Sequence, residues 1–290
     1  MPNPTEYWYD DKRSLYCGDA REVVPALTQT WDAVVCDPPY GEQLVAGDDN
    51  PEHSAKLFHE TLVTCKPRLR PGAMLAFFWS NRSLDLGLEA AKSAGFEFRR
   101  LLTMHVQQSA ARPYRGWLPK TQPIVVMQLP GRAIPAWREE SCKKLQAAME
   151  ARGIKQRELA EKIGCDRRLV MKWVRVYDPH WSYPSEEHRV LLNEILGVDL
   201  PPAPEEAETY RPDYYDVRSG SPSTSHPCEK PLWVIEDLMS RLGKSVLDPF
   251  VGSGTALVAA RNLGIECVGV DVDARHCETA MRRMGQMILF

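Results

Sequence analysis

Residues 245–255, Ser-Val-Leu-Asp-Pro-Phe-Val-Gly-Ser-Gly-Thr, end a short β-rich run with a glycine-containing turn that leads directly into a helical pattern. Gly252 and Gly254 carry no side chain and tolerate positive φ, so the backbone of this turn can approach a ligand closely. The next β-rich run, 266–270, is followed by Asp271, nineteen positions after Gly252. An acid at about this spacing accepts hydrogen bonds from ribose hydroxyls in nucleotide-binding βαβ units. The pattern predicts a nucleoside cofactor.

The turn alone does not identify that cofactor, and a tight strand-to-helix turn without a ligand is the competing interpretation. The chain lacks here the complete G-x-G-x-x-G of dinucleotide sites and the G-x-x-x-x-G-K-[ST] of phosphate-binding loops. A nucleoside cofactor without a pyrophosphate therefore fits the pattern better.

A second motif, Asp37-Pro-Pro-Tyr40, follows the strand pattern 31–36 at its carboxyl end, where open α/β sheets place their active sites. An exocyclic amine is a poor nucleophile because its lone pair is delocalised into the ring. The carboxylate of Asp37 and the carbonyl of Pro38 could accept its two hydrogens, while Pro38 and Pro39 stiffen the loop. The ring of Tyr40 could stack on a base turned out of a duplex. Taken alone, the tetrapeptide is equally compatible with a strand-ending turn.

Together, the motifs at 37–40 and 248–255 strongly resemble the amino-methylating DNA methyltransferases of bacteria and phages. His226-Pro-Cys-Glu-Lys-Pro231 looks like the segment that precedes the cofactor motif in that family, and Gly18-Asp19 looks like its acid upstream of the catalytic loop. The order, with the catalytic motif first, is similar to the permuted β class. The resemblance covers roughly residues 14–130 and 211–285.

The resemblance implies S-adenosylmethionine as the cofactor, and the scattered cysteines, with no His at zinc-finger spacing, indicate no metal site. Its methionine end is expected near Asp248 and Lys230, its ribose at Asp271 and its adenine near Asp19, although an ordinary surface charge is the competing interpretation for Asp19 and Lys230. The full expected cofactor set is Asp19, Lys230, Asp248, Phe250, Gly252, Ser253, Gly254, Thr255 and Asp271. The expected catalytic set is Asp37, Pro38, Pro39 and Tyr40.

One strand departs from the family pattern. Members often carry Trp-x-Lys where this chain reads Leu101-Leu-Thr-Met-His-Val-Gln107, so the site for the flipped base can be lined differently. His105 is expected to be a polar site or core residue rather than a general base, since direct transfer from a sulfonium requires no strong base.

The domain organisation follows from the alternation of patterns. Between residues 15 and 128, strands expected at 33–36, 74–79, 100–106 and 124–127 alternate with helices expected at 54–69 and 84–94, which predicts a sheet with parallel strands covered on both faces. The same α/β pattern resumes after a purely helical stretch and the proline-rich acidic segment 201–208. We expect a Rossmann-like methyltransferase fold with a circularly permuted motif order and an inserted all-α helix-turn-helix domain. The expected bounds are 1–135 for the catalytic half, 136–200 for the insertion, 201–210 for a linker and 211–290 for the cofactor half.

The helical stretch carries a local positive charge. The whole chain has a net charge of −3, yet residues 141–180 contain ten Lys or Arg against five Asp or Glu. Residues 156–173 have helix-turn-helix spacing: Gly164 makes the turn, Asp166 caps the second helix, and Val170 and Trp173 face inward. The stretch resembles the phage-repressor type, with Gln156 at a position used for backbone contact. A small helical bundle with a solvated basic face is the alternative.

The expected DNA contacts come from two segments. The segment 112–120 mixes cations with aromatics, which suits a phosphate backbone and an extruded base as well as it suits a solvated loop. In the helical stretch, the outer face of the second helix would reach base edges. The candidate DNA-binding residues are Arg112, Arg115, Trp117, Lys120, Gln156, Arg167, Arg168 and Lys172.

Composition limits the alternatives. The 290 residues are 43% apolar and 26% charged, as in an ordinary globular protein. The apolar runs are far shorter than a membrane span, and the acidic N-terminus lacks a signal-peptide pattern, so a cytoplasmic location is expected. The eight cysteines are scattered without a C-x-x-C pair, which indicates reduced, mostly buried thiols.

The expected function is site-specific methylation of N6 of adenine in double-stranded DNA after base flipping, without a membrane partner. N4 methylation of cytosine is the nearest alternative, although family members acting on cytosine more often begin the tetrapeptide with Ser instead of Asp37. An RNA or protein-glutamine methyltransferase, disfavoured by the helix-turn-helix pattern, and a catalytically inactive DNA-binding regulator stay open. The sequence specifies neither the target site, nor the oligomeric state (a homodimer is compatible), nor a partner restriction nuclease.

Overall fold

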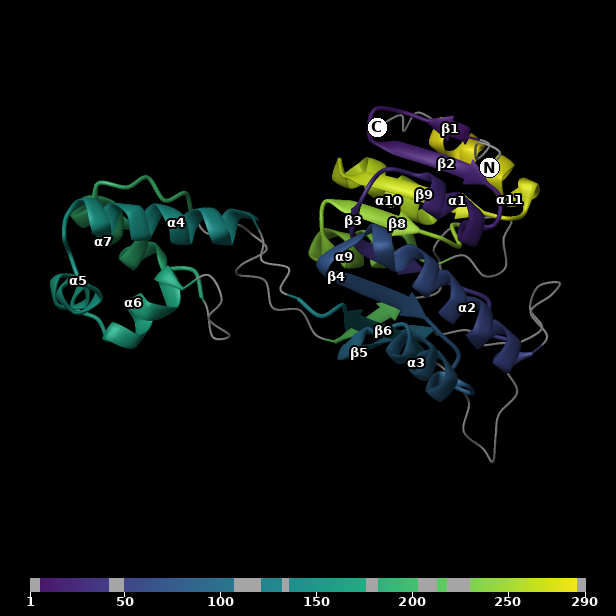
Figure 1. Cartoon of the computed structure of the whole chain (residues 1–290), viewed down its shortest axis with the longest axis horizontal. Helices are drawn as coiled ribbons and strands as arrows, with labels where there is room; N and C mark the ends of the chain where they lie inside the picture. The colour runs from purple at the N-terminus through teal and green to yellow at the C-terminus, as the bar shows by residue number, and fades with distance from the viewer. Residues whose placement is uncertain are drawn as a thin grey trace. The chain divides into compact units, whose positions relative to one another are not determined.

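A twisted sheet forms the centre of the larger of two structural units, which comprises Met1–Gly131 together with Pro212–Phe290 (Figure 1). The structure is a computed structural model, and it describes residues 6–41, 50–106, 121–131, 136–175, 182–202, 213–217 and 230–285. In these ranges the sheet has nine strands in the order β1-β2-β9-β8-β3-β4-β6-β5-β7. The strands are β1 Glu6–Tyr9, β2 Arg13–Cys17, β3 Trp31–Cys36, β4 Leu69–Phe78, β5 Glu97–Val106, β6 Thr121–Gln128, β7 Tyr214–Val217, β8 Ser245–Asp248 and β9 Glu266–Asp271.

Most of the strands end at the same edge of the sheet. The run β2-β9-β8-β3-β4 is parallel throughout. β6 is antiparallel to both β4 and β5, and β5 is parallel to β7. β5 and β7 therefore also end at this edge, and β6 begins there; we call it the carboxyl edge. It is the edge at which open α/β sheets bind ligands.

Helices cover both faces of the sheet, as predicted for an α/β fold. Alternate β3 residues face opposite sides: Val34 and Cys36 belong to one hydrophobic cluster, and Ala33 and Val35 to the other. The first cluster is covered by α1 Ala20–Ala26, α2 Pro51–Cys65 and α3 Leu84–Ser93, and the second by α9 Leu232–Leu242, α10 Thr255–Leu263 and α11 Ala274–Gly285.

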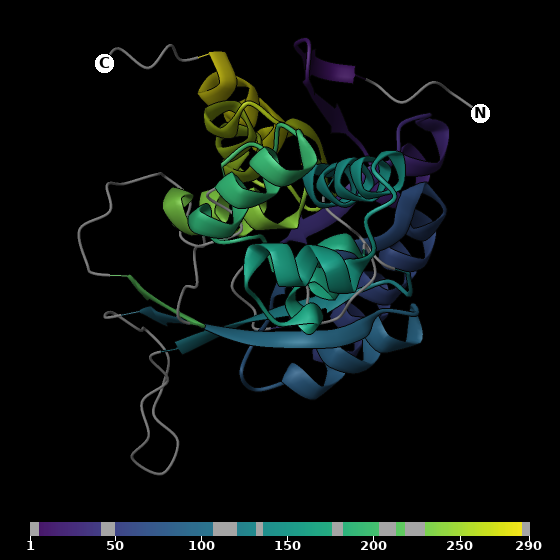
Figure 2. The ribbon, with the colours of Figure 1, turned by 90° about the vertical axis from the view of Figure 1, so that its left-hand side faces the viewer.

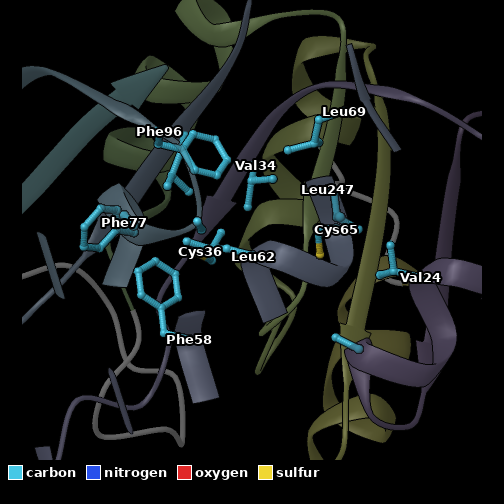
Figure 3. Close-up of a cluster of buried hydrophobic side chains, with 14 of the residues drawn as sticks. Val24, Val34, Cys36, Phe58, Leu62, Cys65, Leu69, Phe77, Phe96 and Leu247 are labelled. Carbon is cyan, nitrogen blue, oxygen red and sulfur yellow. The ribbon is translucent and has the colours of Figure 1, made fainter. Parts of the chain in front are cut away.

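The first cluster is shown in Figure 3. Phe58 and Leu62 of α2 are fully buried beside Val34 and Phe77 of the sheet, and the ring centroids of Phe58 and Phe77 lie 4.8 Å apart. Residues of the two sequence halves meet in this core, since Leu247 of β8 belongs to the same cluster. The burial of these large side chains fixes the strands on whose ends the site is built.

The smaller unit, Arg132–Arg211, is helical in its described residues. It contains α4 Ala136–Ala151, α5 Gln156–Ile163, α6 Arg167–Val174 and α7 Glu186–Leu196, drawn in teal and green in Figures 1 and 2. Leu159, Val170, Trp173 and Leu192 form its hydrophobic centre with seven other buried residues. Apolar side chains at helical spacing thus give this unit a core of its own.

Several elements differ from the sequence expectation. The helix expected at 54–69 ends at Cys65, because the short 3₁₀ helix η1 (Lys66–Arg68) follows and β4 begins at Leu69. The sequence patterns did not indicate the strand β7, which has only four residues. They also did not indicate the helix α1, which has Pro25 in its last turn. β7 also lies in the segment expected to form the cofactor half, yet it pairs with β5 at the other end of the sheet.

The seven described cysteines are free thiols, and five of them are buried. Burial raises the pKa of Cys65 to about 12, so this thiol stays protonated. Cys228 lies outside the described residues. Over the described ranges, no helix is long and apolar enough to cross a membrane, and no group of three His, Cys, Asp or Glu residues is arranged to hold a metal ion.

Candidate active site at the carboxyl edge of the sheet

Two motifs that are far apart in the sequence follow neighbouring strands. β3 pairs in parallel with β8, with Ala33 opposite Val246 and Val34 opposite Leu247. The loop 37–40 begins directly after β3, and the glycine turn begins directly after Asp248, the last residue of β8. The register therefore places the ends of these two strands, and with them the two motifs, side by side.

Asp37 is bound by a cation from the other half of the sequence. The Nζ atom of Lys230 forms an ion pair with Oδ2 of Asp37. Lys230 is only 8% exposed, and its Nζ lies 5.2 Å from the centroid of the Phe78 ring. The structure brings the ammonium of Lys230 to the loop 37–40, and its expected place at the methionine end of a cofactor stays a prediction.

Tyr40 is held in place by two neighbours. Its hydroxyl accepts a hydrogen bond from Nε2 of Gln122, the second residue of β6, at 3.1 Å. Its ring lies 6.0 Å from the Trp79 ring, at an interplanar angle of 52°. Pro38, also expected in the catalytic set, is buried, and Pro39 is partly exposed. Gln122 was not among the residues expected from sequence, because only the antiparallel pairing of β6 with β4 brings it to this edge.

The glycine turn is fixed by its backbone conformation and by contacts with the end of β9 and with α11. Gly252 and Gly254 have φ values of +51° and +84°, which favour glycine. The N–H of Gly252 donates to Oδ2 of Asp271 at 2.9 Å, and a Cβ atom on Gly254 would lie 2.7 Å from Cβ of Ala280 in α11. Both glycines are thus required by backbone conformation, and Gly254 also by close packing.

Three hydrogen-bonding groups contact the carboxylate of Asp271. Besides the N–H of Gly252, it accepts from the N–H of Asp273 at 2.9 Å, and its Oδ1 lies 3.2 Å from Nδ1 of His276. The backbone carbonyl of Asp271 accepts from the N–H of Gly18 at 2.8 Å. This last contact brings the loop that carries Asp19 to the end of β9.

Asp19 caps helix α1. Its carboxylate accepts from the N–H of Arg21 at 2.8 Å and from the guanidinium of Arg21, which also binds Glu60. The hydrogen bond from Arg21 lowers the pKa of Asp19, so this carboxylate is ionised at neutral pH. The residue expected near a cofactor adenine therefore already has a structural partner.

Asp248 is a buried carboxyl group. It is 6% exposed, and its Oδ1 accepts from the N–H of Phe250 at 3.0 Å. Burial raises the pKa of Asp248, and the negative charges of Asp37 and Asp271 act in the same direction. A cationic group of a ligand placed beside Asp248 would reverse this trend and favour the carboxylate.

An arginine that the sequence analysis missed supports the far side of the turn. Nη1 of Arg283, in α11, donates to the carbonyl and to Oγ of Ser253, both at 2.9 Å, and to Oγ1 of Thr255 at 3.2 Å. Ser253 and Thr255 are buried, and Phe250 packs partly buried against the first cluster. Ser253 and Thr255 thus contribute to the shape of the turn through their contacts with Arg283.

The hydrogen-bond acceptors of the site fit a nucleoside that carries an amino acid. Ordered carboxylates at Asp19 and Asp271, a buried carboxyl at Asp248 and two glycines offer hydrogen-bond acceptors and close backbone approach. Hydroxyl and ammonium groups are the ligand groups that such acceptors bind.

His105 lies at the same edge but outside the core. It is the second-to-last residue of β5, and its Nδ1 lies 3.1 Å from Oδ1 of Asp216 in β7. Its side chain is 43% exposed, so His105 is not a core residue, and the other expected role, as a polar residue of the pocket, stays a prediction.

The helices α5 and α6 present cations to solvent. α5 ends at Gly164, which has a left-handed conformation, and Asp166 caps α6 by accepting from the N–H of Arg168 at 2.7 Å. Arg167 and Arg168 are exposed at the start of α6, whereas Lys172 and Gln156 are partly exposed. The remaining DNA-contact candidates, Arg112, Arg115, Trp117 and Lys120, lie outside the described residues.

Comparison with known proteins gives a family match over most of the chain. The family model described as DNA methylase, with the short name N6_N4_Mtase, matches residues 31–282. The chain is 37% identical over 62 residues to the Type II methyltransferase M2.DpnII of Streptococcus pneumoniae, a match that spans 20% of this chain and 23% of that protein. It is 23% identical over 279 residues to the Type II methyltransferase M.HpaI of Haemophilus parainfluenzae, which covers 93% of this chain and 73% of that protein.

Solved structures show the same fold at low sequence identity. M1.HpyAVI aligns with a TM-score of 0.55 and 15% identity over 95% of this chain and 100% of the other. The PvuII DNA methyltransferase, described as cytosine-N4-specific, aligns with a TM-score of 0.59 and 11% identity over 99% and 91%. The predicted fold class is thereby confirmed.

Proposed function

The chain belongs to the DNA methylase family, and from this membership we propose that it transfers a methyl group from S-adenosylmethionine to an exocyclic amino group of a base in DNA. The main structural support is the parallel pairing of β3 with β8. It brings an acceptor loop for an amine and a turn suited to a nucleoside to neighbouring strand ends, where the two reactants need to meet.

Five residues would hold the cofactor. Asp271 would accept from the ribose hydroxyls, and Asp248 from the ammonium of the methionine part, while the backbone at Gly252 and Gly254 allows close approach. Asp19 would face the adenine from the loop that Gly18 joins to β9. When bound, S-adenosylmethionine supplies a methyl group activated by its sulfonium.

The loop 37–40 prepares the amine. The carboxylate of Asp37 and the carbonyl of Pro38 would accept the two hydrogens of the exocyclic nitrogen, which directs its lone pair out of the ring plane. Tyr40, held by Gln122 and next to Trp79, would stack on the base turned out of the duplex. Methyl transfer would break the bond between sulfur and the methyl carbon and leave S-adenosylhomocysteine, and the methylated nitrogen would then release one proton to solvent. Because that nitrogen carries a positive charge and is acidic, this step needs no strong base.

We propose N6 of adenine as the methylated atom. The support is Asp37 as the first residue of the tetrapeptide, where family members acting on cytosine more often have Ser. N4 of cytosine is the second candidate, and the fold shared with the cytosine-N4-specific PvuII enzyme favours keeping it. Both bases present an amine next to a ring nitrogen.

We assign target recognition to the helices α5 and α6. Asp166 caps α6 so that Arg167 and Arg168 stand exposed in its first turn, which is the part of a recognition helix that reaches base edges in the major groove. The core formed by Leu159 and Val170 fixes the two helices relative to each other.

The proposed function is tested by product analysis. The protein is incubated with unmethylated DNA and S-adenosylmethionine carrying a labelled methyl group, and digested nucleosides are identified by mass spectrometry. Labelled N6-methyladenine is the expected product, and labelled N4-methylcytosine would replace the adenine assignment. The variant Asp37→Ala should yield neither while it still binds the cofactor. If the unaltered chain gives no methylated product, the result would favour the alternative function, a catalytically inactive DNA-binding regulator.

A further inference from the structure

Lys230 and Asp37 form the most deeply placed ion pair at the candidate site, and the mechanism above does not use the lysine. Nζ of Lys230 contacts Oδ2 of Asp37, and the side chains are 8% and 27% exposed. An ammonium taken out of water requires a close anion, because its desolvation is otherwise too costly. The pair therefore constrains both side chains more strongly than an exposed ion pair would.

The position of the ammonium is set by well-packed neighbours. Pro231 caps α9 directly after Lys230, and Val234 and Ile235 of that helix are buried against the sheet. Phe78, only 1% exposed, lies below Nζ at 5.2 Å from the ring centroid. The lysine is thus fixed at its backbone and near its charged end, whereas Asp37 lies in a loop that follows a strand.

The charges around Asp37 would disfavour its ionised form without this lysine. Asp248, at the end of β8, is close enough for the charge of Asp37 to raise its pKa, and the buried thiol of Cys36 responds to the same charge. Asp271 adds a further negative charge beside Asp248. Lys230, which directly precedes the cap residue Pro231 of α9, brings a positive charge to this group of acids. A protonated Asp37 would offer fewer acceptor positions to an amine.

We propose that Lys230 is a positioning residue for Asp37: it orients the carboxylate and keeps it ionised, so that it can accept hydrogen bonds from the target amine. This inference rests on the proposed function and gives Lys230 a role toward the base instead of toward the methionine carboxylate. The two roles could not be distinguished from sequence, because Asp37 and Lys230 lie 193 positions apart.

The test compares Lys230→Met, which keeps the length and removes the charge, with Lys230→Arg, which keeps the charge. Lys92→Gln, at an exposed position on α3, is the matched control. Single-turnover methyl transfer is measured from pH 5 to 9 at saturating cofactor and DNA, and cofactor Kd is measured separately. In Lys230→Met we expect the acid limb of the rate profile to move up by about one pH unit or more, with cofactor Kd changed less than about threefold. In Lys230→Arg the acid limb should lie close to its position in the unaltered chain. The control variant should show the same rate profile and cofactor Kd as the unaltered chain.

An unchanged acid limb together with a cofactor Kd raised about tenfold or more would overturn the proposal and make Lys230 a cofactor ligand.

A second measurement does not depend on activity. The ¹³Cγ signal of Asp37, identified by its loss in Asp37→Asn, is titrated in the unaltered chain and in Lys230→Met. A higher midpoint in the variant supports the proposal even if no DNA methylation is found, and equal midpoints contradict it. Failure of the proposed function and failure of this inference are thus distinguishable.

Discussion

The N–H of Gly252 donates to the carboxylate of Asp271 at 2.9 Å, which joins the turn after β8 to the end of β9. The same carboxylate also accepts from the N–H of Asp273. A single side chain thus links the two backbone segments that would surround the sugar of a nucleoside.

Asp271→Ala is expected to weaken both cofactor binding and the fold. It leaves two backbone donors without their acceptor, which costs about 1–3 kcal/mol of unfolding free energy for each donor left buried. Cofactor Kd should rise by about tenfold or more, and Asp271→Asn should lie between. Titration with S-adenosylmethionine and thermal denaturation measure the two effects. Glu266→Gln, at the exposed start of the same strand, is the control, and equal effects at both positions would contradict this role.

Asp248→Asn is expected to flatten the pH dependence of stability. Because burial raises the pKa of Asp248 in the folded state, the folded protein binds this proton more tightly than the unfolded chain does. The resulting stabilisation is fully present below the unfolded pKa of about 3.9 and declines as the pH rises through the folded pKa.

The asparagine variant lacks this decline, so its Tm should exceed that of the unaltered chain increasingly from pH 5 to 9 and converge with it toward acid pH. Asp85→Asn, exposed on α3, should show no such divergence. Parallel Tm curves for the Asp248 variant and the unaltered chain would show that the buried carboxyl does not control this dependence.

Gln122→Leu is expected to impair methyl transfer through Tyr40. The substitution removes the donor to the Tyr40 hydroxyl, and Tyr40→Phe removes the acceptor. In a double-mutant cycle the two changes should be coupled by about 1 kcal/mol, in stability and in the activation free energy of methylation. Gln128→Leu, at the other end of β6, should combine additively with Tyr40→Phe. Additivity at Gln122 would mean that the hydrogen bond does not position the ring.

Arg283→Met is expected to loosen the glycine turn from its outer side. The guanidinium donates to Ser253 and Thr255, and hydrogen bonds of charged groups contribute about 1.5–3 kcal/mol. The variant should show a Tm lower by several degrees and a higher cofactor Kd. Arg282, the exposed residue that precedes Arg283 in α11, provides the control variant Arg282→Met. A normal cofactor Kd in Arg283→Met would limit the arginine to a role in folding.

Replacing Arg167 and Arg168 together by Ala is expected to change which sequences are methylated. Cofactor Kd should stay the same, because these residues belong to the helical unit, whereas the residues proposed to hold the cofactor belong to the larger unit. Methylation-sensitive sequencing of DNA exposed to each variant gives the site preference. Lys143→Ala with Lys144→Ala on α4 removes the same charge. If both double variants weaken methylation equally at all sites, the arginines contribute charge and not sequence reading.

The motifs and their strands could be predicted because they are local in sequence. The strand before Asp37, the strand before Asp248 and the helix Thr255–Leu263 all carry apolar patterns that the structure confirms. The parallel pairing of β3 with β8 then brings the two motifs to one edge of the sheet, which is where such sheets bind ligands.

The supporting residues could not be predicted, because their partners are distant in sequence. The contact of Lys230 with Asp37 depends on how α9 packs, and the contact of Gln122 with Tyr40 depends on the reversed direction of β6. β7 was missed for a related reason: four residues carry little periodic signal, and only the pairing with β5 makes them a strand.

The place at which the sheet is interrupted has an evolutionary consequence. The chain leaves the sheet after β6 and re-enters it at β7, and β5 lies between these two strands and pairs with both. The intervening segment 132–211 can therefore be exchanged by recombination without altering any strand that carries Asp37, Asp248 or Asp271. On the proposed role of the helical unit in target recognition, such an exchange would change the preferred DNA sequence while the residues proposed for methyl transfer stay the same.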